Sequence, residues 1–129
     1  MKKLLLVLIL VWTLSGFINI YAENLKAYLS YSTFVSPEHG PYIETYLAIL
    51  GRSISFVKND QGKFQGMVEV TLIFKQDSVV KDFEKYELLT QEVDDTSSID
   101  FNLIDQKRFV LPNGTYEFEV ILSDKKWKK

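Results

Sequence analysis

The sequence predicts an all-β fold, an antiparallel immunoglobulin-like β-sandwich of six to seven strands preceded by a signal peptide. Beyond residue 22, apolar and polar residues alternate almost everywhere, which is the period of half-buried strands. Turn-forming residues recur about every ten residues and no segment has a clear helical pattern. An open barrel is the alternative. A parallel sheet is excluded, because it would need crossover helices.

Residues 1–22 have the three parts of a secretory signal peptide. Lys2 and Lys3 give a positive start, residues 4–14 are almost wholly apolar, and Ala22 suits the position before a cleavage site. The apolar run is short for a membrane span, so cleavage is favoured over an uncleaved anchor. We therefore expect an exported, periplasmic or secreted protein that begins at Glu23.

Composition limits the partners of the chain that remains. It has the length of one domain and no cysteine, so the core must be stable without disulfides. The full sequence has 15 basic and 17 acidic residues, but two lysines lie in residues 1–22 and four in the basic stub, residues 125–129. Residues 23–124 thus carry nine basic against 17 acidic residues, a net charge of −8. Nucleic-acid binding is disfavoured, since phosphate backbones are repelled.

The first half of the domain contains four predicted strands. Alternation runs over residues 25–32 and, after a loop with two prolines, over residues 42–49, and a short third strand contains Ile54 and Phe56. A turn at residues 58–63, in which Gly62 can adopt positive φ, leads to the strongest strand. In that strand four apolar side chains share one face: Val68, Val70, Leu72 and Phe74.

The second half is less regular. Residues 77–93 fit both helical and strand spacing; we favour a strand from about Phe83 to Leu89, with a helical turn near Val80 as the alternative. An acidic loop at residues 92–98 follows, and alternation resumes over residues 99–103. The last strand is predicted from Tyr116 to Leu122.

The spacing Leu111-x-x-Gly114-x-Tyr116 is typical of a tyrosine corner, in which the hydroxyl bonds to the backbone a few residues earlier. Such a corner opens the penultimate strand of an immunoglobulin-like sandwich, so one more strand should follow Leu122. We therefore expect residues 125–129 to begin a truncated continuation. The strand count argues the opposite, since up to seven strands are already present.

Several segments resemble one bacterial family. The matching segments are Leu25-Lys26-Ala27-Tyr28, residues 37–47, Gly62-Lys63-Phe64-Gln65-Gly66, Val68-Glu69-Val70, Ile99-Asp100-Phe101 and residues 111–116. Together they are similar to the N-terminal sandwich region of the GWxTD domain-containing proteins. The resemblance implies an exported Gram-negative protein with sandwich domains ahead of a C-terminal region. The Gly-Trp-x-Thr-Asp motif that names this family does not occur in the sequence. Trp127 is not part of such a motif, since a lysine stands on each side of it.

No catalytic, cofactor-binding or metal-binding residue is nominated. His39 is the one histidine and has no cysteine to activate, so we interpret it as a solvated loop residue. Zinc would need more nitrogen or sulfur ligands. Calcium is the metal that a cluster of carboxylates would suit, because it prefers oxygen ligands. The spacing of the candidate acidic residues, however, matches no known calcium-binding loop. These residues, interpreted as a solvated loop, are Glu92, Asp94, Asp95 and Asp100.

Three tyrosines, Tyr28, Tyr42 and Tyr46, are predicted on the outer faces of the first two strands, where they could bind a sugar or a protein. We therefore expect a non-catalytic structural or interaction domain of an exported multidomain protein, with other domains or a protein partner as its contacts and no transmembrane segment in the mature chain. The alternative is a carbohydrate- or peptide-binding module that uses the exposed tyrosines. A concave platform of all three would favour the module.

Overall fold

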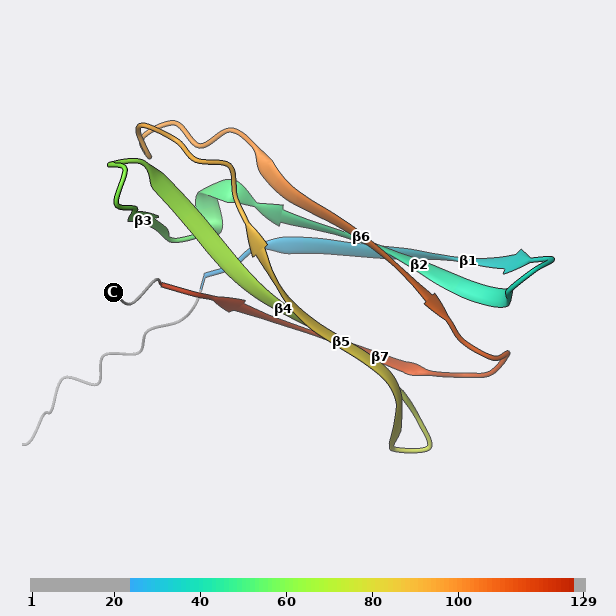
Figure 1. Cartoon of the computed structure of the whole chain (residues 1–129). Coiled ribbons are helices and arrows are strands. Elements are labelled where there is room, and N and C mark those ends of the chain that lie inside the picture. The colour runs from blue at the N-terminus through green and yellow to red at the C-terminus, as the bar shows by residue number, and fades with distance from the viewer. Residues whose placement is uncertain (1–23, 127–129) are drawn as a thin grey trace, which may run out of the picture.

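A computed structural model describes residues 24–126 and shows two antiparallel sheets packed face to face (Figure 1). The sandwich prediction is confirmed. The predicted signal peptide, residues 1–22, and the end of the basic stub lie outside the described residues. No helix within residues 24–126 is long and apolar enough to cross a membrane. The elements in chain order are β1 (Ala27–Ser36), β2 (Gly40–Leu50), the 3-10 turn η1 (Gly51–Ser53), β3 (Phe56–Lys58), β4 (Phe64–Gln76), β5 (Val79–Leu89), β6 (Asn102–Val110) and β7 (Glu117–Asp124).

The strand order is that of an immunoglobulin-like sandwich. One sheet has the order β1-β2-β6, which corresponds to strands A, B and E of that fold. In the other sheet β4 is central and corresponds to strand C. β5 lies along one edge of β4, as strand C′ would, and β7 lies along the opposite edge, as strand F would. The short β3 pairs with the first residues of β4. Every pairing is antiparallel.

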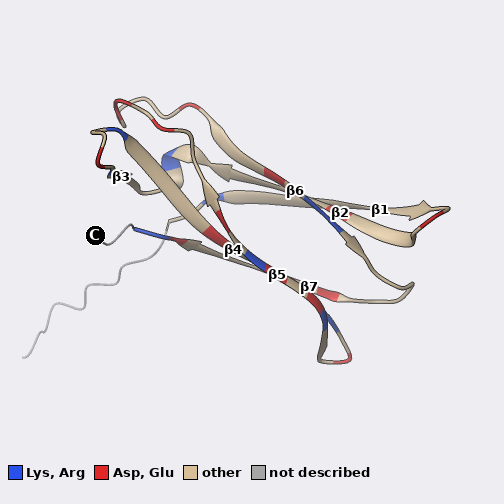
Figure 2. Cartoon of the chain, in the orientation of Figure 1, with Lys and Arg blue, Asp and Glu red and all other residues tan. Residues whose placement is uncertain are grey.

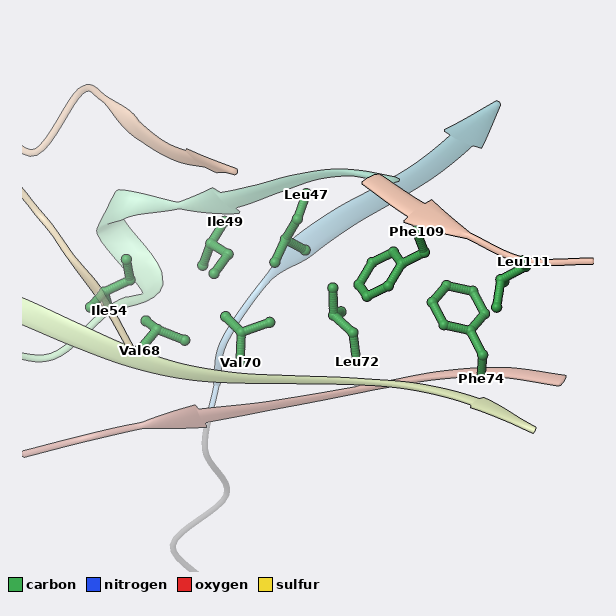
Figure 3. Packing of buried hydrophobic residues seen from close by; sticks show 9 residues of the cluster. All are labelled: Leu47, Ile49, Ile54, Val68, Val70, Leu72, Phe74, Phe109 and Leu111. Carbon is green, nitrogen blue, oxygen red and sulfur yellow. The ribbon is translucent and has the colours of Figure 1, made fainter. Parts of the chain in front are cut away.

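The core lies between the two sheets and is built mainly on β4 (Figure 3). The predicted inward face of this strand is confirmed, since its four apolar side chains are almost fully buried. Phe74 stacks on Phe118 of β7 with ring centroids 4.4 Å apart and contacts Phe109 of β6 at 4.8 Å. Rings from three strands and both sheets therefore meet at one end of the core. The buried apolar residues are Leu47, Ile49, Ile54, Val68, Val70, Leu72, Phe74, Phe109 and Leu111.

The doubtful stretch at residues 77–93 is mostly strand. β5 begins at Val79, so the alternative of a helical turn near Val80 is wrong. The hairpin that joins β4 to β5 has a two-residue loop, Asp77 and Ser78, and both residues adopt positive φ. That is the geometry of a type I′ turn, whose twist suits a tight hairpin. The other predicted turn is confirmed: Gly62 has φ +81° and Asn59 N–H bonds to the Lys63 carbonyl.

The tyrosine corner is also confirmed. Tyr116 stands just before β7 and its hydroxyl donates a hydrogen bond to the Pro112 carbonyl, at 2.9 Å. The ring packs against the core but is only partly buried. The hydroxyl end is exposed, so water can replace it on the carbonyl.

Tyr116→Phe is expected to lower the free energy of unfolding by about 1 kcal/mol, the net contribution of one hydrogen bond. The loss is no larger because water can bond to the exposed Pro112 carbonyl in the variant. Urea denaturation of the wild type and the variant measures this change. An identical midpoint in both proteins would show that the hydroxyl does not stabilise the turn.

Candidate interaction surface

The outer face of the β1-β2-β6 sheet combines aromatic, apolar and charged side chains. Residues that pair across strands point to the same side of a sheet, so the register defines this face. Its members from β1 are Tyr28 and Phe34; those from β2 are Tyr42, Glu44 and Tyr46; those from β6 are Ile104, Gln106, Arg108 and Val110. The predicted outward orientation of the three tyrosines is therefore confirmed.

Glu44 occupies the centre of this face, and only 7% of its surface is exposed. Its carboxylate accepts a hydrogen bond from the Tyr46 hydroxyl at 2.5 Å and one from Gln106 Nε2 at 3.4 Å. The Arg108 guanidinium donates through Nε, at 3.0 Å, and through Nη2. A buried carboxylate is costly unless charge and hydrogen bonds compensate it. This one has both.

The hydrogen bonds of Glu44 determine its ionisation. The bond from Tyr46, and then the bond from Arg108, hold the pKa of the Glu44 carboxyl below its ordinary value. The same contact with Glu44 raises the pKa of the Tyr46 hydroxyl. A general acid needs a raised pKa, whereas Glu44 is kept ionised and fully engaged. The cluster therefore fixes the shape and charge of the face and is unsuited to proton transfer.

An aromatic pair adjoins this cluster. Phe34 and Tyr42 stack with ring centroids 5.3 Å apart, and the Arg108 guanidinium carbon lies 4.8 Å from the Tyr42 ring centroid. Arg108 therefore contacts both a carboxylate and an aromatic ring, a use for which its planar group is well suited. Tyr42 is held between two neighbours and is partly buried.

Apolar side chains are exposed at both ends of the outer face. Tyr28 and Ile104 flank Ala48 at one end, whereas Phe34 and Val110 flank Tyr42 at the other. Ala48 and Tyr42 are six residues apart on β2, so Tyr28 and Tyr42 are separated by about 20 Å. The three tyrosines therefore do not form one platform.

The remaining candidates from the sequence lie elsewhere. His39 is exposed in the β1–β2 loop, where its N–H bonds to Ser36 Oγ. In the acidic loop, Glu92 accepts from Asn59 Nδ2 at 2.7 Å and Asp94 pairs with Lys63 at 3.5 Å. Asp95 bonds to Ser97, while Asp100 is exposed. Within the described residues, no group of three histidine, cysteine or acidic side chains could hold a metal ion.

Comparison with protein-family models, curated proteins and solved structures found no match to this chain.

Glu44→Gln is expected to lower the denaturation midpoint at pH 7, because it removes the charge that Arg108 and Tyr46 stabilise. The folded-state pKa of Glu44 is lowered, so this stabilisation is present above the ordinary pKa of a glutamate and is lost as the pH falls through the folded value. The difference between wild type and variant should therefore shrink below about pH 4. Urea titrations at pH 7 and pH 3 measure it. An equal difference at both pH values would contradict the assignment.

Proposed function

We propose that this chain is a non-catalytic structural or interaction domain of an exported, periplasmic or surface-located multidomain bacterial protein. Segments of its sequence resemble the N-terminal sandwich region of the GWxTD domain-containing proteins, and this resemblance supports the proposal. The observation that carries the proposal is the pair of exposed apolar patches on the outer face of β1-β2-β6, on either side of the Glu44 cluster. Exposed apolar groups beside fixed polar ones are typical of protein contact surfaces.

The Glu44 cluster supports a binding role because it is rigid before any partner arrives. Its side chains come from two paired strands and are held by mutual hydrogen bonds. A partner would then pay little of the entropy cost of ordering this surface. Aromatic and arginine side chains, represented here by Phe34, Tyr42 and Arg108, are frequent among the residues that contribute most to protein association.

The partner proposed is a protein, either another domain of the same molecule or a separate chain. A sugar-binding module would need its aromatic rings on one platform, and the 20 Å scale separation of Tyr28 from Tyr42 argues against that. The acidic balance of residues 23–124 argues against nucleic acid. Export is inferred from the pattern of residues 1–22.

Site-specific photo-cross-linking in the producing cells tests the proposal. A photoreactive phenylalanine analogue replaces Phe34 on the outer face, and a matched control replaces Phe83, which is exposed on the outer side of the other sheet. We expect a discrete protein adduct from position 34 and none from position 83. No adduct at position 34, or the same adducts from both positions, would contradict the proposal. N-terminal sequencing of the same exported protein should begin at Glu23, and a start at Met1 would contradict the inferred cleavage.

A further inference from the structure

Asn113 and Gly114 form the single Asn-Gly pair in the sequence, and they lie in the loop between β6 and β7. Both residues are exposed. The side-chain carboxamide carbon of an asparagine and the backbone nitrogen of the next residue can close a succinimide ring, and asparagine is accordingly one of the thermolabile residues of proteins. Glycine permits the closest approach of that nitrogen, because it has no Cβ. The turn therefore contains a chemically reactive pair.

The structure leaves both reacting groups of this pair available. Within residues 24–126, no hydrogen bond engages the Asn113 side chain or the Gly114 backbone N–H. The bond from the Tyr116 hydroxyl to the Pro112 carbonyl crosses the loop and uses neither group. The carboxamide can therefore turn towards the Gly114 nitrogen without breaking a hydrogen bond of the described chain.

The loop is also uncharged. No lysine, arginine, aspartate or glutamate occurs in residues 109–116, and Figure 2 shows the connection from β6 to β7 in tan. An acidic neighbour would disfavour loss of a proton from the Gly114 nitrogen, because like charges repel. None is present within the loop itself.

The other asparagines of the described chain are less reactive by the same criteria. Each is followed by a residue that has a side chain; they are Asn24, Asn59 and Asn102. Asn59 is also fixed in place, because its Oδ1 accepts from the Gln61 and Lys63 N–H groups. Its Nδ2 donates to Glu92 at 2.7 Å. Asn113 is therefore the asparagine at which ring closure is expected first.

We propose that Asn113 is a site of spontaneous covalent modification, at which water converts the carboxamide to aspartate or isoaspartate. The Gly114 nitrogen loses its proton to hydroxide and bonds to Asn113 Cγ. The Cγ–Nδ2 bond breaks, and Nδ2 takes a proton from water and leaves as ammonia, which restores the hydroxide. Water then opens the succinimide: cleavage of the new N–Cγ bond gives aspartate, and cleavage of the original peptide C–N bond gives isoaspartate.

The isoaspartate product alters the backbone inside the tyrosine corner. The hydrogen bond from Tyr116 to Pro112 closes a loop that contains residues 113–115. In isoaspartate the main chain runs through Cβ and Cγ, so this loop gains one main-chain atom. Aspartate adds the same charge but leaves the main chain unchanged. We therefore expect isoaspartate, and not aspartate, to weaken the corner. The reaction does not depend on the interaction proposed for the outer face.

Gly114→Ala is the matched variant for the chemistry. Gly114 does not have positive φ, so its backbone conformation suits alanine. The added Cβ would lie 2.6 Å from Gln76 Nε2, which is the end of a flexible side chain and can move. The variant should therefore fold, while its methyl group hinders attack by the backbone nitrogen.

The test follows the full chain during incubation in mildly alkaline buffer, with tryptic digestion and mass spectrometry of successive samples. Cleavage after Arg108 and Lys125 releases residues 109–125, which contain one asparagine and no glutamine. Conversion of amide to acid in that peptide therefore reports Asn113 alone. The synthetic peptide of residues 109–125 gives the rate in the absence of the fold, and Asn59 is followed in the same digests as an internal control.

We expect the rate at Asn113 in the folded protein to lie within about fivefold of the rate in the synthetic peptide, since the loop gives little protection. Gly114→Ala should lower the rate about tenfold, and Asn59 should remain unmodified over the same time. The isoaspartate form, separated by chromatography, should unfold at a lower urea concentration than the variant Asn113→Asp. This difference should shrink in the Tyr116→Phe background, which lacks the corner bond.

Two results would overturn the assignment of the site: a rate in the folded protein that falls below this fivefold range, or equal rates in wild type and Gly114→Ala. Modification of Asn59 as fast as that of Asn113 would also contradict it. An isoaspartate form with the same urea midpoint as Asn113→Asp would show that the modification does not act through the tyrosine corner.

Discussion

Replacing Phe74 by alanine is expected to lower the free energy of unfolding by about 3–5 kcal/mol, the usual cost of truncating a buried phenylalanine. The ring is 1% exposed and contacts Phe118 and Phe109, so the cavity would be bordered by both sheets. These neighbours belong to different strands and cannot collapse into the space together. The loss should therefore approach the upper part of the range.

Urea denaturation followed by circular dichroism measures this effect. Phe83→Ala is the matched control, because Phe83 is exposed on the opposite face of the sheet and its truncation should change the free energy by less than about 0.5 kcal/mol. Comparable losses in the two variants would show that the interior is not packed as described.

Of the substitutions proposed for this protein, Gly51→Ala is expected to cause the second largest loss in the free energy of unfolding. An added Cβ would lie 2.3 Å from the Phe101 carbonyl oxygen and 2.9 Å from Ile99 Cγ2. The first of these atoms belongs to the backbone and accepts a hydrogen bond from Gly51 N–H, so it cannot move away without breaking that bond. We expect a loss of about 3 kcal/mol, as for severe overpacking.

Arg52→Ala provides the control for Gly51→Ala, because this neighbouring side chain in η1 is exposed. Its substitution should change the free energy of unfolding by less than about 0.5 kcal/mol. If Gly51→Ala were as stable as Arg52→Ala, the close approach of η1 to residues 99–101 would be wrong.

Local patterns predicted the parts of the fold that depend on local chemistry. Alternation identified the inward face of β4, and the positive φ of Gly62 followed from its place in a turn. The β4–β5 hairpin was missed because Asp77 and Ser78 form its loop without glycine or asparagine, the residues that signal a type I′ turn. Residues of β5 then matched helix and strand spacing equally.

The polar contacts were less accessible to sequence reasoning because they depend on register between distant strands. Tyr42 and Tyr46 were placed outward from local alternation, and Glu44 must share their face. Its partner Arg108 is 64 residues away, and nothing local specifies that pairing. The inward face of β6 is hard to predict for a related reason, because Asp105 and Lys107 interrupt its apolar alternation. Both are polar inward-facing residues whose partners, Tyr86 and Glu84, lie on β5.

The strand order has a consequence for the way in which the chain folds. The β1–β2, β3–β4 and β4–β5 hairpins each join neighbouring strands through short loops, and hairpins of this kind form within about 1–10 μs. The β2–β6 and β4–β7 pairs join residues far apart in the sequence, and such contacts form slowly because loop closure precedes them. Residues 102–124 supply β6 to one sheet and β7 to the other. During synthesis, the apolar faces of the earlier hairpins therefore stay exposed and prone to aggregation until this segment adds β6 to one sheet and β7 to the other.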